Sequence, residues 1–245
     1  MTDDLPDSSP ADRADARADA RAGATGDIEA LERVLAERWS CRGYLPEPVD
    51  DATLERLLEA ARRTPSWCNT QPWRVDVLSG DAARELSAAM LAGLEQGGSD
   101  LDFPQAYTGV HRDRRRESGW QLYDAVGIEK GDRDRSFLEG LRNFELFGAP
   151  HVAIISAPRE LGTYGAIDCG LYVQTFLLAA QALGLGACAQ AALAGQSSLL
   201  HEHLDIPEDR AVVCGISFGR PDPDHPTASY RTSRAPLAET VTRRG

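Results

Sequence analysis

Residues 166–183 form the segment that most constrains how this 245-residue chain folds. They have the length of about five helical turns and are apolar on nearly every side. A helix of this kind needs protein around it, so we expect it in the core of a large fold or at a dimer interface. Its apolar side chains include Leu171, Val173, Phe176, Leu177, Leu178, Ala179 and Ala180.

Four shorter segments have the pattern of β-strands. Residues 151–157 are apolar and rich in β-branched side chains, which is typical of a central strand, and residues 211–219 are predicted as a last core strand. Residues 187–191 are predicted as a third strand, and residues 73–78 alternate apolar and polar side chains as a half-buried strand does. The strands are mixed with helices without a regular βαβ succession, which predicts an α+β layered fold.

Capping residues and helical periodicity predict the helices around these strands. Asp27 is placed to cap a helix that runs to about Arg38, and Asp50 or Asp51 is placed to cap the next one. A further helix starts at residues 80–81. The remaining predictions are helices over about 132–147 and 196–203 and a loop over residues 96–109.

A polar loop over residues 65–72 separates the second of these helices from the strand at 73–78. Ser66, Asn69 and Gln71 supply hydrogen-bond donors and acceptors, and Trp67 supplies a flat apolar face. This combination suits a planar heteroaromatic ligand with polar edges better than a metal ion or a bare phosphate. The alternative is a turn in which Ser and Asn bond their own backbone beside two core tryptophans.

Composition narrows the class of protein. A net charge of -12 argues against a nucleic-acid partner, which needs a basic face. No apolar run is long enough to span a bilayer, and the N-terminus lacks the regions of a signal peptide. Five cysteines without a C-x-x-C pair fit reduced thiols. We therefore expect a cytoplasmic protein with no membrane partner.

The first 26 residues differ from the rest in composition. They are rich in Ala, Asp and Arg and have almost nothing to bury, which predicts an acidic, disordered tail over residues 1–26. Residues 27–245 are then predicted to form a single domain.

Three further sequence patterns bear on function. The arginines at positions 112, 114, 115 and 116 favour a solvated helix face over an anion site, because acidic residues are interspersed with them. The G-x-G-x-x-A pattern at 184–189 follows a helix and opens a strand, which is the reverse of a dinucleotide fingerprint. His201 and His203 are two apart and do not share a helix face, so no metal site is predicted.

Four blocks of the chain together resemble the nitroreductase family of FMN-dependent flavoproteins. The most specific is Pro-Ser-Trp-Cys-Asn-Thr-Gln-Pro-Trp at 65–73, which is similar to the family's Pro-Ser-x-x-Asn-x-Gln-Pro-Trp loop. Arg-Trp-Ser-Cys-Arg at 38–42 is similar to its Arg-x-Ser-x-Arg segment. The other two blocks are residues 183–188 and residues 215–222, the latter followed by the basic segment 231–237.

The resemblance implies an α/β sandwich with a central, mostly antiparallel sheet flanked by helices, in an intertwined homodimer that holds FMN between its protomers. In this arrangement Ser66, Trp67 and Asn69 approach the flavin ring from the second protomer. The cofactor-binding residues that the resemblance implies are Arg38, Ser40 and Arg42 with Arg231 and Arg234 for the phosphate and ribityl chain, the loop residues Ser66, Trp67, Asn69 and Gln71, Asn143 for the pyrimidine edge, and Ala189 and Gln190 near the reactive nitrogen.

The resemblance also implies the reaction. NADPH or NADH transfers hydride to flavin N5, and a nitroaromatic, a quinone or a similar flat acceptor then reacts at the same face in a ping-pong cycle. The flavin carries this chemistry, so no catalytic side chain is expected. Two alternatives stay open: a flavin enzyme of the same fold with another reaction (dehydrogenase, reductive dehalogenase or flavin-fragmenting enzyme), and a flavin-binding protein without turnover.

Overall fold

The computed structural model describes residues 26–245, and the chain divides into two units after Arg38. The described part of the first unit is a helix over residues 26–37, which already includes Asp27, so the prediction that Asp27 caps it is wrong. The predicted disordered tail lies outside the described residues except for Gly26. The single domain over residues 27–245 stays a prediction.

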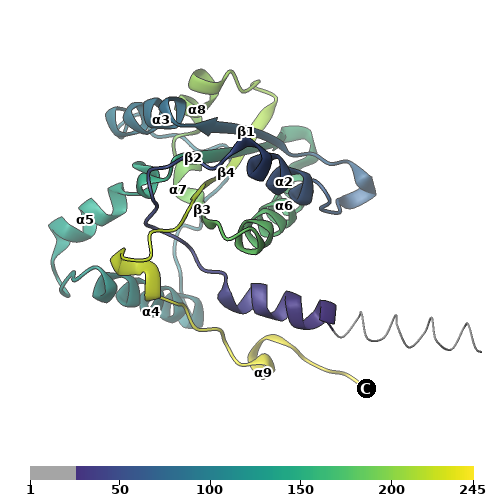
Figure 1. Ribbon diagram of the computed structural model, residues 1–245, viewed down its shortest axis with the longest axis vertical. Coiled ribbons are helices and arrows are strands. Elements are labelled where there is room, and N and C mark those ends of the chain that lie inside the picture. The colour runs from purple at the N-terminus through teal and green to yellow at the C-terminus, as the bar shows by residue number, and fades with distance from the viewer. Residues whose placement is uncertain (1–25) are drawn as a thin grey trace, which may run out of the picture. The chain divides into compact units, whose positions relative to one another are not determined.

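The second unit, residues 39–245, is built on a four-stranded antiparallel sheet with the order β1-β2-β4-β3 (Figure 1). All four predicted strands are present, which confirms the central antiparallel sheet. Their bounds are β1 Arg74–Ser79, β2 His151–Pro158, β3 Gly186–Gln190 and β4 Arg210–Gly219.

Helices cover both faces of the sheet, with α3 and α8 on one side and α2 and α6 on the other (Figure 1). Strand β2 shows why: Val152 and Ile154 belong to the first core, and Ala153 and Ile155 belong to the second. The alternation of side chains along a strand sends successive residues to opposite faces. The helices are α2 Asp51–Ala61, α3 Asp81–Ala92, α4 Gly109–Ala125, α5 Arg133–Leu141, α6 Gly162–Ala182, α7 Ala191–Ala194, α8 Ser197–Leu204 and α9 Leu237–Thr240.

The predicted helix over 132–147 is wrong in its second half. Helix α5 ends at Leu141, and the chain then turns into a short 3-10 helix, η2, over Leu146–Gly148. Leu146 and Phe147 have positive φ angles of 55° and 54°, which no continuing helix allows. Both side chains are buried in the core beside α3, so tertiary packing overrides the local helical pattern.

Helix α6 corresponds to the apolar segment 166–183, which was expected in the core of the fold or at a dimer interface. Cys169, Tyr172 and Phe176 pack into the core, which confirms the core placement. Tyr164 and Ile167 on another side of the helix are 57% and 50% exposed. An apolar face of α6 therefore remains open in one copy of the chain. No helix within residues 26–245 has both the length and the apolar character that crossing a membrane requires.

The predicted loop at 96–109 is fastened to the sheet by the Asp100 carboxylate. Its Oδ1 accepts a hydrogen bond from the Arg159 guanidinium at 2.6 Å, and its Oδ2 accepts from His201 Nε2 at 2.9 Å and from the Val212 N–H at 2.8 Å. Burial by itself raises the pKa of the Asp100 carboxyl. The hydrogen bonds outweigh burial, so this pKa lies below its ordinary value of 3.8.

Because the folded protein favours the Asp100 carboxylate, its contribution to stability is present above the ordinary pKa and is lost as the pH falls through the folded pKa. We expect Asp100→Asn to lower the free energy of unfolding by about 1–3 kcal/mol at neutral pH, with the deficit shrinking as the pH falls below the ordinary pKa of 3.8. Urea unfolding at a series of pH values measures both. Asp102→Asn, in the exposed part of the same loop, is the control; a deficit that does not vary with pH contradicts the prediction.

Candidate functional site

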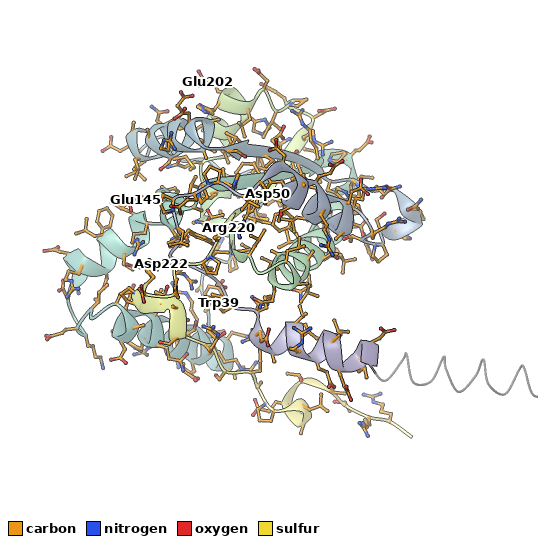
Figure 2. All side chains as sticks on the ribbon, in the orientation of Figure 1. Trp39, Asp50, Glu145, Glu202, Arg220 and Asp222 are labelled. Carbon is orange, nitrogen blue, oxygen red and sulfur yellow. The ribbon has the colours of Figure 1, made fainter. Side chains whose placement is uncertain are left out.

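The segment over residues 39–45 runs beside β3 and the residues that follow β4. The Cys41 N–H donates to the Ala187 carbonyl at 3.2 Å, and the Leu45 N–H donates to the Arg220 carbonyl at 2.9 Å. Figure 2 shows Trp39 and Arg220 in this part of the molecule. The segment that carries Ser40 and Arg42 is therefore held by the sheet.

Two glycines make this approach possible. Gly184 ends α6 with a φ of +73°, a conformation that glycine adopts at little steric cost. At Gly186, which opens β3, a Cβ atom would lie 2.6 Å from the Cys41 sulfur. The G-x-G pattern thus follows a helix and opens a strand, as the sequence predicted, and its role is close packing.

Ser40 and Arg42 lie together, and the structure adds Arg142 to them. Arg42 Nη1 donates to the Ser40 carbonyl at 3.2 Å, and Arg142 Nη2 lies 3.5 Å from the Arg42 carbonyl. The Arg42 guanidinium also lies 5.7 Å from the centre of the Phe147 ring. Nothing in the sequence pointed to Arg142, because only the turn after α5 brings it to this place.

The carboxyl group of Glu139 interacts with both of these arginines without forming an ion pair to either. Burial raises the pKa of Glu139 more than Arg142 and Arg42 lower it, so its neutral form is favoured relative to an ordinary glutamate. Its Oε1 atom is buried without a hydrogen-bond partner among the described residues. Because neither Arg42 nor Arg142 forms an ion pair with a carboxylate within residues 26–245, both can bind an external anion.

Asn143 and Gln190 also come together, but the Gln190 side chain is occupied. Its Nε2 donates to the Asn143 carbonyl at 2.8 Å, and its Oε1 accepts from the Ser217 hydroxyl. Gln190 is only 2% exposed, so its side-chain amide is satisfied within the protein. Ala189, one residue earlier, is exposed at the end of β3.

The C-terminal arginines are placed differently from each other. The Arg231 guanidinium lies 4.3 Å from the centre of the Trp39 ring, next to Ser40 in the chain. Arg234 donates to the Thr232 hydroxyl at 2.8 Å and so turns toward its own segment. The Trp39 Nε1 is buried and has no partner among the described residues. Of the two C-terminal arginines, Arg231 is therefore the one that contacts the segment over residues 39–45 within the same chain.

The loop over residues 65–72 adopts an uncommon backbone. Cys68, Asn69 and Gln71 have φ angles of 52°, 56° and 47°, a region that asparagine tolerates better than the other two. The Ser66 hydroxyl accepts a hydrogen bond from the Gln71 N–H at 2.9 Å, as the turn alternative supposed. Trp67 contradicts that alternative, since it is 62% exposed and not in the core.

Two polar side chains fasten this loop to the rest of the protein. The Trp67 N–H donates to both carboxylate oxygens of Asp168, at 3.1 and 3.2 Å. The Arg210 Nη2 donates to the Pro72 carbonyl at 2.9 Å. Asp168 belongs to α6 and is only 5% exposed, so the loop is anchored to a buried charge. Sequence reasoning missed both anchors, since neither is near the loop in the chain.

The predicted site residues thus form two groups at opposite ends of β4. The loop is tied to Arg210 at the start of the strand. Gln190 is bonded to Ser217 in its second half, and Ser40 forms a bridge with Ala187 of β3, which pairs with Phe218 of β4. Ser217 lies seven positions after Arg210, which is about 23 Å along an extended strand. Arg38 belongs to the first unit, and its part in the site stays a prediction. Within residues 26–245, no three His, Cys, Asp or Glu side chains cluster as metal ligands would.

Comparison with known proteins agrees with this architecture. The model of the nitroreductase family matches residues 35–220. The chain is 35% identical over 223 residues to the nitroreductase NfnB of Mycolicibacterium smegmatis, covering 89% of this chain and 95% of that protein. It is 36% identical over 222 residues to a 4-nitrobenzoate reductase of a Nocardioides species, covering 88% and 90%.

A comparison with solved structures also finds a nitroreductase. The crystal structure of the FMN-dependent nitroreductase NfnB from Mycobacterium smegmatis in complex with NADPH matches with a TM-score of 0.85 and 33% identity, over 89% of this chain and 99% of that chain. The likeness confirms the predicted fold class. A family match over most of the chain, with relatives above 30% identity, shows that this protein belongs to the nitroreductase family.

Proposed function

We propose that this protein is an FMN-dependent oxidoreductase that uses NAD(P)H to reduce nitroaromatics, quinones and similar flat, electron-poor acceptors. The observation that carries the proposal is the pair Arg42 and Arg142 beside Ser40. Neither arginine forms an ion pair with a carboxylate among the described residues. Guanidinium groups held in this way bind phosphate oxygens well.

The descriptions of the relatives support the same reaction. NfnB from Mycobacterium smegmatis is described as FMN-dependent and was solved with NADPH. Other relatives are described as 4-nitrobenzoate, nitrobenzene and chloronitrobenzene reductases. All three substrates are flat nitroaromatic rings, which fit an exposed aromatic surface such as that of Trp67.

The residues of this chain fit FMN in charge and in shape. Arg42 and Arg142 supply positive charge for the phosphate, and Asn143 supplies an amide for a polar ring edge. The exposed loop offers the Asn69 amide and the face of Trp67 for the ring itself. When bound, FMN accepts a hydride from the nicotinamide and passes electrons to the acceptor. The protein binds the cofactor and orients both substrates, and no proton-transferring side chain is required.

We propose that the complete site forms between two copies of the chain. The loop and the Ser40–Arg42 segment lie at opposite ends of β4, so the two groups of one copy are too far apart to meet at one flavin ring. The open apolar face of α6, with Tyr164, Ile167 and Leu171 exposed, would be covered by a partner of the same kind. A homodimer satisfies both requirements.

We also propose a cytoplasmic location. All five cysteines are free thiols in the structure, at positions 41, 68, 169, 188 and 214. Burial raises the pKa of Cys41 to about 11 and that of Cys169 to about 12, so these thiols are kept protonated. Free cysteines of this kind are typical of a reducing compartment.

The reaction is tested by adding NADPH to the purified protein without oxygen. We expect a yellow protein whose flavin absorption is lost much faster than that of free FMN under the same conditions, and is restored by 4-nitrobenzoate. A flavin reduced no faster than free FMN indicates a binding protein without turnover. A colourless protein that takes up no FMN contradicts the proposal as a whole.

The anchor of the loop is tested with Asp168→Ala, which removes the acceptor of the Trp67 N–H. We expect FMN affinity to fall roughly tenfold, because a hydrogen bond to a charged group is lost and the loop relaxes. Asp168→Asn keeps one acceptor oxygen and should retain most of the affinity. Titration of the apo protein with FMN, with thermal unfolding as a check on folding, measures the effect; equal affinities for wild type and Ala variant contradict the role of Asp168.

The dimer is tested by light scattering at micromolar concentration, where we expect twice the chain mass of 26.5 kDa. Ile167→Glu places a charge on the open face of α6 and should shift the protein toward monomer with loss of bound FMN. Ala88→Glu adds the same charge to an exposed position of α3 and should change neither. A monomeric wild-type protein that still binds FMN tightly contradicts the two-copy site.

A further inference from the structure

A cavity of about 500 Å³ opens between α4 and the segment that carries Arg42. Two arginines of α4, Arg115 and Arg116, line it together with Arg42. Its walls also hold the aromatic side chains of Trp120, Tyr123 and Tyr230. The cavity thus combines three guanidinium groups with aromatic rings, directly beside the candidate phosphate site.

The four arginines of α4 differ in whether a carboxylate neutralises them. Arg112 forms an ion pair with the neighbouring aspartate at 3.1 Å, and Arg114 forms one with Glu239 at 2.8 Å. For Arg115 and Arg116, the described part of the chain holds no carboxylate within ion-pair distance. The arginines that line the cavity are therefore the two that keep an uncompensated charge.

The sequence favoured a solvated face for this cluster, and residues 111–117 are indeed exposed. Exposure does not explain why the unpaired arginines line the same cavity. Arg115 lies over the Tyr107 ring, 5.4 Å from its centre, which limits the freedom of its guanidinium. Arg42, Arg115 and Arg116 all line this one cavity. Like charges around one cavity repel each other, and an anion bound there lowers that repulsion.

The aromatic walls have a defined geometry. The rings of Trp120 and Tyr123 meet edge to face, with centres 5.8 Å apart. The Tyr230 hydroxyl lies 3.0 Å from the Ser118 hydroxyl, which ties the C-terminal segment to α4. The Arg42 guanidinium lies 5.9 Å from the Tyr230 ring centre and connects the cavity to the Ser40–Arg42 segment. A flat ring can therefore stack here while an attached anionic group reaches α4.

We propose that Arg115 and Arg116 determine substrate specificity by binding an anionic group on a flat substrate of the enzyme. The shared chemistry is a terminal oxyanion next to an aromatic ring system: the 2′-phosphate of a phosphorylated nicotinamide donor, or the carboxylate of a nitroaromatic acid. The guanidinium fork matches both groups. This inference rests on the proposed function and names the substrate feature that the same site selects.

A second cavity, of about 420 Å³, lies on the other side of the Ser118–Tyr230 contact and is lined by Arg114 and Arg234. It is the weaker anion site, because Glu239 pairs with Arg114 and the Arg234 guanidinium donates to its own segment. The first cavity is therefore the stronger candidate for binding an anion, because the arginines of α4 that have no ion pair within residues 26–245 line it.

The kinetic test compares Arg115→Gln and Arg116→Gln with Arg112→Gln, which removes an already paired charge from the same helix. Four KM values are measured for each holoenzyme: NADPH and NADH as donors, 4-nitrobenzoate and nitrobenzene as acceptors. We expect KM for NADPH, for 4-nitrobenzoate or for both to rise roughly tenfold in the two test variants, the loss typical of one charge-assisted hydrogen bond. KM for NADH and KM for nitrobenzene should stay within about twofold of the wild-type values. Arg112→Gln should leave all four KM values within the same range.

Direct binding separates recognition from turnover. Calorimetry with adenosine 2′,5′-bisphosphate and with benzoate reports the phosphate arm and the carboxylate arm on the FMN-loaded protein. We expect the probe of the affected arm to bind the Gln variants more weakly and Arg116→Lys to recover part of the affinity. Added salt should weaken binding in wild type more than in the variants, because the site is exposed.

The pattern of KM changes shows which anionic group Arg115 and Arg116 bind. A change confined to NADPH assigns the phosphate, and a change confined to 4-nitrobenzoate assigns the carboxylate. Equal effects of the test variants and Arg112→Gln overturn the proposal, and so does loss of FMN from the test variants, which would assign these arginines to the cofactor. If the wild-type protein oxidises neither NADPH nor NADH, the proposed function fails. If in that case neither adenosine 2′,5′-bisphosphate nor benzoate binds, the anion site is overturned as well.

Discussion

The structure depends on strand β2 being buried on both faces and paired along both edges. Its successive residues alternate between two cores, one beneath α3 and α8 and one beneath α2 and α6. A slip of one residue would move each core side chain to the wrong face, so packing strongly specifies the register of β2 against β1 and β4. The sheet and the helices packed on it hold both the segment over residues 39–45 and the polar loop.

The register of the sheet also determines where the parts of the site lie. The Ser40–Arg42 segment lies beside β3 and the end of β4. The polar loop is anchored near the start of β4 by Arg210. A rigid strand between them keeps the two groups apart within one chain. The same rigidity makes a shared site between two copies a natural arrangement, since each copy presents one group at each end. The α4 cavity beside Arg42 extends one of these groups and supplies the charge for substrate choice.

Much of the fold could be predicted because its signals are local. Strands such as 151–157 show as short β-branched runs, and the helix at 166–183 shows as a long apolar one. The break after Leu141 could not be predicted, because the left-handed residues Leu146 and Phe147 are kept in place by burial in a core built from distant segments. For the site, residue types in the loop indicated a flat ligand, and that assignment stays a prediction. Its anchors, Asp168 and Arg210, gave no signal, because each is about one hundred residues or more away along the chain.

The sequence by itself determined most of the secondary structure, the polar chemistry of the loop at 65–72 and the likeness to the nitroreductase family, because periodicity, turn residues and short motifs act over a few residues. Only the tertiary structure decided which of those residues meet. It placed Arg142 beside Arg42, occupied the Gln190 amide with Asn143 and Ser217, and gave two arginines of α4 no carboxylate partner within residues 26–245. Such contacts join segments far apart in the chain, and the packing of the two cores against one sheet brings those segments together.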